Sequence, residues 1–244
     1  MPLTTREKAL CLVPCFNEAA NLPELLRELQ SPALRGRCDL LLLDDGSRDE
    51  TAGLLEGSGL PLIRHPANLG YGAAIKSGLR YARDQGYRHL VVFPGDRQRS
   101  IEDLLRLVQE IESGPIDLVV GNKLHAPVSI PWRRALGNRF FSLMARALWR
   151  APFRDVLSGF KAYRVASVAP FLEQLPDRYE FDLVLSLHCG KLGLTVREIP
   201  VSVRYHAHST KMTSEVGVGL KMLKAALKSF YGKGGKPAVV PLGD

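Results

Sequence analysis

Two adjacent carboxylates, Asp44 and Asp45, come directly after a run of four leucines at 40–43. Four apolar residues in a row are typical of a strand that is buried on both faces of a sheet. The residues that follow offer a turn and then a helix that Ser47 or Asp49 can cap. Because open α/β sheets bind ligands beyond the carboxyl ends of their strands, both carboxylates are expected at the mouth of a ligand site. The alternative is that they serve only as turn and cap residues.

Polar residues also follow two later apolar runs. The run at 89–93 leads into Pro94-Gly95-Asp96-Arg97-Gln98, and the run at 117–120 leads into Gly121-Asn122-Lys123. Both runs predict buried strands. We therefore expect acidic side chains from separate strand ends, Asp45 and Asp96 above all, to converge on a single cleft.

A glycine-bearing segment at 68–78 invites comparison with phosphate-binding loops. Walker A requires a glycine directly before Lys-Ser, and Ile75 occupies that position here. The dinucleotide fingerprint fails at the same residue. What remains is the start of a helix whose N–H groups can face an anion. The alternative is close helix–sheet packing at Gly72, Ala73 and Ala74.

Strand-like and helix-like segments alternate along the first half of the chain. Strands are expected at 9–13, 40–43, 60–64, 89–93 and 117–120. Between them, a helix over 22–29 is expected to start at Asn21 and one over 101–111 at Ser100. This alternation predicts an α/β fold with a parallel or mostly parallel sheet.

The second half of the chain changes character. The expected elements are a helix over 131–149, a strand over 160–164, a helix ending near 192 before Gly193, an edge strand over 194–203 that contains Pro200, and an amphipathic helix over 216–231. A flexible tail is expected at 232–244.

Composition restricts the classes of protein and partner. The chain has 244 residues, a net charge of +8 and four cysteines, and no apolar run reaches the roughly 20 residues of a membrane span. The start of the chain lacks a signal-peptide core, so we expect a cytoplasmic protein with buried, reduced thiols. The basic charge suits an anionic ligand or membrane surface. Nucleic-acid binding is not expected, because the basic residues are dispersed and no nucleic-acid motif occurs.

Several short motifs occur in an order that resembles one family. They are Val13-Pro14 with Asn17-Glu18, the segment at 44–49, Asn68-Leu69-Gly70 with Gly72, Ala73 and Gly78, Asp155 with Ser158-Gly159-Phe160, and Ile199-Pro200-Val201 with Lys211. Over roughly residues 9–215 this pattern resembles the inverting GT-A glycosyltransferases of family 2, specifically the dolichol- or polyprenyl-phosphate sugar transferases. The resemblance implies a GT-A fold, a Rossmann-like three-layer α/β/α sandwich with a mostly parallel central sheet. It implies one domain over 1–231, with a nucleotide-sugar half at 1–123 and an acceptor half at 124–231.

The resemblance also implies an activity and a site. Such enzymes use a nucleotide-diphosphate sugar, here expected to be a UDP- or GDP-sugar, commonly with Mg²⁺ or Mn²⁺. A polyprenyl phosphate oxygen attacks the anomeric carbon and displaces the nucleotide diphosphate. The nucleotide-sugar site is assigned to Pro14, Asn17, Glu18, Asp44, Asp45, Lys76, Gly95, Asp96 and Lys123. Asp96 is the expected catalytic residue and, with Gln98, the expected metal ligand. Lys123 stands where the family commonly has Arg.

The residue types suit this chemistry. A leaving diphosphate gains negative charge, which a divalent cation and a Lys or Arg can stabilise. A phosphate acceptor is already ionised at pH 7, so it needs positioning more than a general base. Its positive partners are expected among Arg133, Arg134, Arg139, Arg204 and Lys211. The alternative for each arginine is a solvated helix face.

Two segments depart from the family pattern. Pro94-Gly95-Asp96 replaces the usual Asp-x-Asp, which removes one anionic metal ligand, although Arg97 can supply part of the missing positive charge. Three interpretations stay open: a weak metal site on Asp96 and Gln98, transfer without metal, or binding without turnover. The segment 205–211 also departs, and its two histidines are either ligands or ordinary loop residues.

The acceptor leaves further alternatives. Polyprenyl phosphates lie in a bilayer, and the helices at 136–150 and 216–231 mix Arg or Lys with Phe, Leu and Trp as surface-bound helices do. We therefore expect peripheral membrane contact, and the alternative is packing of both helices on the sheet. A soluble or polysaccharide acceptor, or a non-catalytic sugar-nucleotide-binding protein, also fits the pattern. The oligomeric state is left open.

Overall fold

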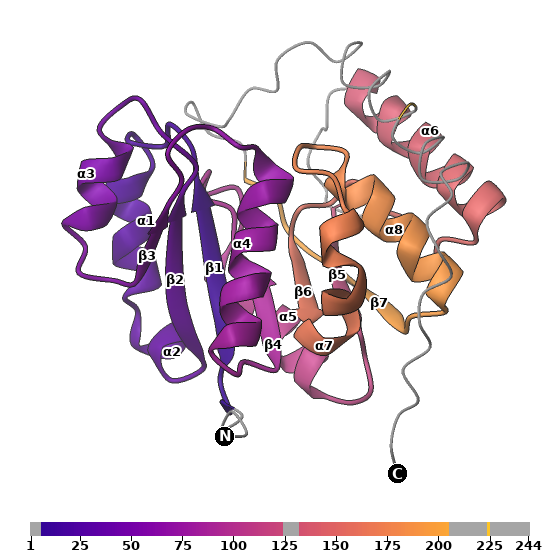
Figure 1. Ribbon diagram of the computed structural model, residues 1–244, viewed down its shortest axis with the longest axis horizontal. Helices are drawn as coiled ribbons and strands as arrows, with labels where there is room; N and C mark the ends of the chain where they lie inside the picture. The colour runs from indigo at the N-terminus through magenta and orange to yellow at the C-terminus, as the bar shows by residue number, and fades with distance from the viewer. Residues whose placement is uncertain (1–5, 124–131, 205–223, 225–244) are drawn as a thin grey trace.

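The computed structural model describes residues 6–123, 132–204 and 224 of the 244-residue chain. Its centre is a seven-stranded sheet in the order β3-β2-β1-β4-β6-β5-β7, shown in Figure 1. The strands are β1 (Ala9–Cys15), β2 (Cys38–Asp44), β3 (Leu62–Arg64), β4 (His89–Val92), β5 (Leu118–Asn122), β6 (Lys161–Arg164) and β7 (Val196–Pro200). All the strand pairs are parallel except those that β6 makes with β4 and β5. The predicted mostly parallel sheet is therefore confirmed.

Helices cover both faces of this sheet. One face carries α1 (Leu22–Leu29), α2 (Pro32–Arg35), α3 (Thr51–Glu56) and α5 (Ile101–Glu112). The other carries α4 (Tyr71–Asp84), α6 (Trp132–Trp149), α7 (Val165–Val168), the 3₁₀ helix η1 (Ala169–Gln174) and α8 (Phe181–Leu192). The result is the expected three-layer α/β/α sandwich.

The two cores follow from the alternation of side chains along the strands. Leu10 and Leu12 of β1 point into the core under α4 and α8, whereas Cys11 and Val13 point into the core under α1 and α5. All four are almost fully buried. A strand that is apolar at every position has to be covered on both faces, which is why the unbroken apolar runs end up at the centre of the sandwich.

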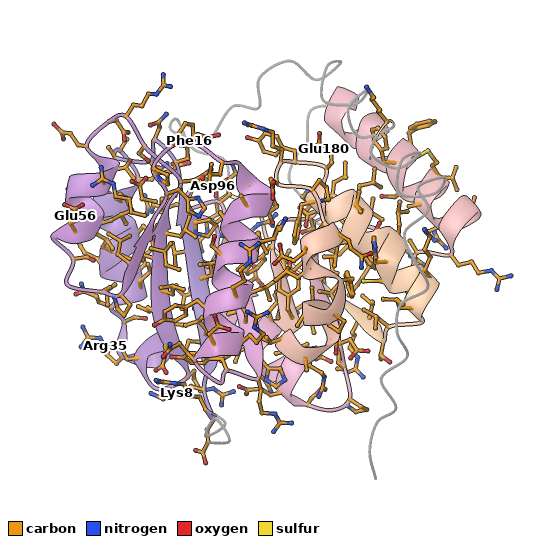
Figure 2. All side chains as sticks on the ribbon, viewed as in Figure 1. Lys8, Phe16, Arg35, Glu56, Asp96 and Glu180 are labelled. Atoms are coloured by element: carbon orange, nitrogen blue, oxygen red, sulfur yellow. The ribbon has the colours of Figure 1, made fainter. Side chains whose placement is uncertain are left out.

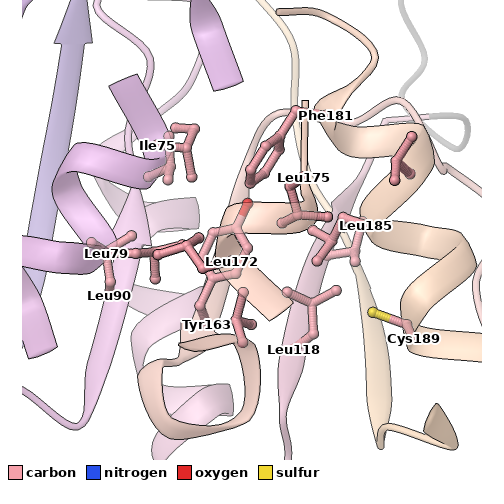
Figure 3. Packing of buried hydrophobic residues seen from close by; sticks show 14 of the residues in the cluster. Ile75, Leu79, Leu90, Leu118, Tyr163, Leu172, Leu175, Phe181, Leu185 and Cys189 are labelled. Carbon is pink, nitrogen blue, oxygen red and sulfur yellow. The ribbon is translucent and has the colours of Figure 1, made fainter. Parts of the chain in front are cut away.

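The core under α4 and α8 joins the two halves of the chain. Leu79 of α4, Tyr163 of β6, Leu118 of β5 and Leu185 of α8 all belong to this core, as Figure 3 shows. The antiparallel strand β6 thus lies between β4 and β5 and brings the second half into the same sheet.

Several local predictions agree with the structure. All four cysteines are buried free thiols. Ser100 Oγ accepts the Asp103 N–H and so caps α5, and Gly193 ends α8 with a φ of 65°. β7 is an edge strand, as Pro200 indicated. No helix in the described part of the chain has the length and apolarity needed to cross a bilayer, and the helix and tail predicted at 216–244 fall almost wholly outside the described residues.

Candidate active site

The ends of β1, β2 and β4 bring two acidic loops to the same edge of the sheet. β1 lies between β2 and β4 and is parallel to both. The Asp45 N–H donates to Cys15 O at 2.9 Å on one side, and the Gly95 N–H donates to Pro14 O at 3.2 Å on the other. Two strand spacings separate the loops, about 10 Å. Asp45 and Asp96 therefore flank the end of β1, and Figure 2 shows Asp96 at this edge.

The loop after β1 is bonded to the loop after β2 by side-chain hydroxyl and amide groups. Ser47 Oγ accepts the Asn17 N–H at 3.0 Å, and Asn17 Oδ1 accepts the Arg48 N–H at 2.9 Å. Thr51 Oγ1 accepts the N–H of the buried Glu18 at 2.8 Å. Asn17 has a φ of 54°, a conformation that Asn tolerates better than most residues. Asn17 and Glu18 are thus fixed beside the predicted nucleoside pocket.

Asp45 holds the loop that follows β3. Its Oδ1 accepts the Leu69 N–H at 3.0 Å and lies 2.7 Å from His65 Nδ1. Its Oδ2 accepts the Gly70 N–H at 2.9 Å and an Asn68 Nδ2 hydrogen at 3.1 Å. A carboxylate has about four acceptor positions, so these four contacts fill them. The role of Asp45 in a nucleoside pocket stays a prediction; the structure shows that Asp45 fixes the loop at 65–70.

His65 is a site residue that the sequence did not reveal. It is buried, and its Nε2 lies 2.9 Å from Ser77 Oγ of α4, so it connects Asp45 to that helix. A lone histidine after a short strand gives no local signal of such a role. His65 is brought into position by the pairing of β3 with β2, which continues as a hydrogen bond of 2.9 Å from the His65 N–H to Asp44 O.

The glycine-bearing start of α4 is occupied by groups of the protein itself. The amides of Leu69 and Gly70 bind Asp45, and the Ala73 N–H donates to Asp177 O at 2.8 Å. A Cβ on Gly72 would lie 2.2 Å from Pro176 O. The anion expected at this helix start is therefore Asp45, and the close packing expected at Gly72 is made with the segment before α8 rather than with the sheet.

Asp44 is the last residue of β2, two residues before a cavity of about 530 Å³ that lies between the loops after β2 and β3. It is fully buried, and its Oδ1 accepts the Ser47 N–H at 3.0 Å. Its Oδ2 lies 3.5 Å from Arg64 Nε and has no hydrogen bond within the described residues. The cavity is lined by residues 46–48 and 64–68, so Arg48 and Arg64 add positive charge to it.

The loop after β4 is positioned by the absence of a side chain at Gly95. A Cβ there would lie 2.8 Å from Cys15 Sγ, so only glycine fits against β1 without a shift. Asp96 follows and is half-buried, with Oδ1 accepting the Gln98 N–H at 3.1 Å. Gln98 O in turn accepts the Arg204 N–H at 3.0 Å.

Arg97 has partners other than the one predicted. Its guanidinium pairs with Glu24 and, at 2.9 Å, with Glu28 of α1. Its φ of 57° is left-handed. Because α1 neutralises this charge, the expectation that Arg97 replaces part of a missing cation is corrected here.

Negative charge gathers at the end of β1. Burial raises the pKa of the Cys15 thiol, and the nearby carboxylates of Glu18, Asp44 and Asp96 raise it further. An anionic diphosphate can enter such a site only with positive charge beside it. In the described ranges no three His, Cys, Asp or Glu side chains form a metal-binding group. Asp96 and Gln98 nonetheless fit a cation shared with a diphosphate, since Mg²⁺ commonly takes one or two protein carboxylates and completes its shell with phosphates and water.

Lys123 directly follows β5 at the same edge of the sheet, and its place in the nucleotide-sugar site stays a prediction. Its N–H donates to Asp155 Oδ2 at 3.2 Å, and its Nζ lies 3.7 Å from Asp155 Oδ1. Burial lowers the pKa of the Lys123 ammonium, while the charge of Asp155 opposes that shift. This amine is therefore held near the site by a fully buried carboxylate.

A buried ion pair supports this side of the site. Lys161 of β6 is fully buried, and its Nζ lies 2.6 Å from Asp182 Oδ1 of α8 and donates to Ser158 O. The sequence did not indicate this pair, because two isolated charges in a strand and a helix carry no sign of their separation in space. Burial raises the pKa of Asp182, and the charge of Lys161 acts in the opposite direction.

The remaining predicted residues are distributed around the molecule. Lys76 Nζ donates to Leu175 O at 3.0 Å and to Asp177 Oδ1 at 2.8 Å, contacts that join α4 to the second half; its donor-binding role stays a prediction. Arg139 is exposed on α6, and Arg204 is exposed next to the Gln98 loop. The side chains of Arg133 and Arg134, and all of Lys211, His206 and His208, lie outside the described residues.

Residues 11–170 match the family model described as glycosyl transferase family 2. The chain belongs to glycosyl transferase family 2. It is therefore a glycosyltransferase, and the resemblance inferred from its motifs is confirmed.

Individual relatives are distant but extend over most of the chain. Polyprenol monophosphomannose synthase of Mycolicibacterium smegmatis is 25% identical over 95% of this chain and 91% of its own length. A UDP-N-acetylglucosamine–dolichyl-phosphate N-acetylglucosaminyltransferase of Methanococcus voltae is 24% identical over 91% of this chain and 96% of its own. Undecaprenyl-phosphate mannosyltransferase of Micrococcus luteus is 26% identical over 80% of this chain and 83% of its own length.

Solved structures confirm the fold class. The crystal structure of glucosyl-3-phosphoglycerate synthase from Mycobacterium tuberculosis, in complex with Mn²⁺, UDP-glucose and phosphoglyceric acid, superposes with a TM-score of 0.71. It is 21% identical and covers 91% of this chain and 80% of that chain. At this identity the likeness establishes the GT-A fold and nothing finer.

Proposed function

We propose that the protein transfers a sugar from a UDP- or GDP-sugar to a polyprenyl phosphate, with inversion at the anomeric carbon. The observation that carries the proposal is the meeting of two acidic loops, after β2 and after β4, on either side of the end of β1. The names of the relatives from Mycolicibacterium, Methanococcus and Micrococcus support the lipid phosphate as acceptor.

In this proposal the nucleoside occupies the cavity after β2 and β3. Residues 46–48, whose Ser47 accepts the Asn17 N–H, line one side of this cavity, and residues 64–68, whose Asn68 is held by Asp45, line the other. Pro14, Glu18 and Asp44 are assigned to the nucleoside by the family pattern. Arg48 and Arg64 at the rim of the cavity face the negative charge that a nucleotide brings. The diphosphate then extends past Gly95, where the lack of a side chain lets the backbone approach, toward Asp96.

Asp96 and Gln98 are proposed to hold Mg²⁺ or Mn²⁺ together with the diphosphate. When bound, the cation offsets the negative charge that builds on the leaving group. Lys123 adds a second positive charge at the same edge. The crystal structure with Mn²⁺ and UDP-glucose supports divalent metal use in this fold.

The acceptor oxygen forms the new bond to the anomeric carbon as the bond to the diphosphate oxygen breaks. The acceptor phosphate is ionised, so this chain's task is to bind and orient it. Arg204, bonded through its backbone to the Gln98 loop, is placed to contribute. Arg133, Arg134, Arg139 and Lys211 remain candidates from the sequence. A lipid acceptor also implies that the protein works as a peripheral protein at a membrane surface.

The test is a transfer assay with radiolabelled UDP- and GDP-sugars and three acceptors: polyprenyl phosphate in detergent, phosphoglyceric acid, and no acceptor. We expect a labelled lipid product only in the first. Asp96→Asn should lower its rate about 100-fold, because it removes the one carboxylate at the diphosphate. Asp84→Asn, an exposed carboxylate paired with Arg83, is the matched control and should leave the rate unchanged.

A transfer to phosphoglyceric acid in place of the lipid would show a soluble acceptor, and donor binding without any transfer would show a non-catalytic protein. Titration calorimetry with each donor, with Mn²⁺ and with EDTA, tests the metal. We expect tighter binding with Mn²⁺, and equal affinity in EDTA would contradict the metal site on Asp96 and Gln98.

A further inference from the structure

The outer face of α6 presents apolar and cationic side chains together. Phe140 and Leu143 are 58% and 68% exposed, the highest values among the exposed large hydrophobic residues of the described chain. Arg139 and Arg146 are exposed beside them, and Arg150 is exposed directly after the last residue of the helix. We call these five residues the α6 face.

The opposite side of α6 accounts for its packing on the protein. Phe141 and Ala145 are buried in the core that α6 shares with α8, and Ser142 is buried with them. At about 100° per residue, the exposed positions from 139 to 147 fall within an arc of about 120° that points away from this core. Figure 1 shows α6 outside α8, so the α6 face has no element of the described structure over it.

The charge on this face is of one sign. Residues 132–149 contain no Asp or Glu. In the described part of the chain no carboxylate pairs with Arg139, Arg146 or Arg150. Guanidinium groups that have no carboxylate partner among the described residues, beside protruding apolar side chains, complement an anionic bilayer, where phosphate headgroups lie directly above acyl chains.

We propose that the α6 face docks on the surface of an anionic lipid bilayer. The inference rests on the proposed function in one respect. The proposed acceptor, a polyprenyl phosphate, is embedded in the bilayer, and this gives the protein a reason to contact lipid. α6 also begins only a short segment after Lys123, so docking through it brings the acceptor side of the site to the membrane. Docking in this way places Arg139 among the lipid headgroups, and its contact with the acceptor phosphate stays a prediction.

Vesicle flotation with the full chain tests this docking. Vesicles are made from equal parts phosphatidylglycerol and phosphatidylcholine, or from phosphatidylcholine alone, without polyprenyl phosphate. We expect binding to the anionic vesicles at low salt and much less binding to the neutral ones or at high salt. Leu143→Gln and Arg146→Glu should each weaken binding about fivefold, the effect of about 1 kcal/mol per group at such a surface.

Matched controls carry the same chemical changes elsewhere. Leu192→Gln alters another exposed leucine, at the end of α8, and Arg35→Glu reverses an exposed charge on the far side of the molecule (Figure 2). Both should bind vesicles as the wild type does. Because all four sites are exposed, thermal unfolding should be nearly unchanged, which separates docking from folding.

Absence of wild-type flotation on the anionic vesicles at low salt would overturn the proposal, and so would equal losses in the controls. A dimer in lipid-free solution that Leu143→Gln abolishes would also overturn it, because a second copy would then cover the face. The assay of sugar transfer in detergent distinguishes a failure of the docking proposal from a failure of the proposed function. Vesicle binding without any transfer would refute the proposed function alone, whereas transfer without vesicle binding would refute the docking alone.

Discussion

Different forces hold together the two sides of the sheet edge: the loops after β1 and β2, proposed as the donor side, and the region around β6 and α8, proposed as the acceptor side. On the donor side, backbone amides converge on carboxylate and hydroxyl oxygens at the ends of the strands, as at Asp45, Ser47 and Thr51. On the acceptor side, ionised groups lie inside the protein, as in the fully buried Lys161 and its partner Asp182. Hydrogen bonds from amides fix loop shape at modest cost, whereas buried charges are stable only as a complete set. The two sides should therefore fail in different ways.

The largest effect is expected from breaking the acceptor-side ion pair. Lys161→Met leaves Asp182 charged and unpaired in the core, which should lower the free energy of unfolding by about 4 kcal/mol. Chemical denaturation measures this loss. The double variant Lys161→Met with Asp182→Leu should recover a large part of it, because both charges of the pair are then removed. A loss below about 1 kcal/mol in the single variant would contradict the distinction between the two sides.

A smaller loss of stability is expected from Asp45→Asn on the donor side. The amide keeps one acceptor but turns an N–H₂ group toward the donors of Asn68 or Gly70, which should cost about 3 kcal/mol. Because Asn68 lines the cavity proposed for the nucleotide, donor affinity should also fall, about tenfold. Unfolding and calorimetry measure the two effects. Lys161→Met, by contrast, should leave donor affinity in the folded protein nearly unchanged.

The junction between the sides, where β4 meets β6, should be sensitive to acid. His89 pairs in register with Arg164, and burial, aided by the charges of Arg164 and Arg88, lowers its pKa to about 4. The unfolded chain binds the proton near pH 6.5, so stability is complete above that pH and falls as the pH drops toward 4. We expect a loss of about 2 kcal/mol between pH 7.5 and pH 5. His89→Gln should flatten this dependence, and an unchanged slope would contradict the assignment.

The smallest effect on stability is expected at Gly95. A Cβ there meets Cys15 Sγ at 2.8 Å, so Gly95→Ala should cost about 1 kcal/mol, while displacement of Asp96 should slow transfer about tenfold. Gly53→Ala is the control, because nothing lies within 4 Å of its Cβ and alanine favours the helix there. Adding Cys15→Ala to Gly95→Ala should restore the rate. If the rate does not recover in the double variant, the contact between residue 95 and Cys15 does not position the loop.

Much of the fold was predictable because buried strands and capped helices have local signals. The apolar run before Asp44 and the Ser100 cap of α5 are examples that the structure confirms. The insertion of β6 between β4 and β5 was not predictable in the same way, because periodicity within a strand does not encode its neighbours in a sheet.

In the candidate site, too, residues with local sequence signals were predictable and contacts that depend on tertiary packing were not. Asp44, Asp45 and Asp96 were identified by strand ends and motif spacing, and the structure places them at one edge. The partners of Asp45 and Arg97 could not be identified from the sequence, because the direction of a side chain depends on which elements pack beside it. His65 reaches Asp45 only through the pairing of β3 with β2, and Arg97 reaches Glu24 and Glu28 only because α1 packs beside its loop.

The start of α4 has one mechanical consequence. On one side Gly70 is bonded to Asp45, and on the other its position leaves only 2.6 Å between an added Cβ and Asp177 O. The loop proposed to meet the donor is therefore in direct contact with the segment that leads into α8. Protein interiors resist compression, so we expect a displacement of the Asp45 loop on donor binding to move that segment as well.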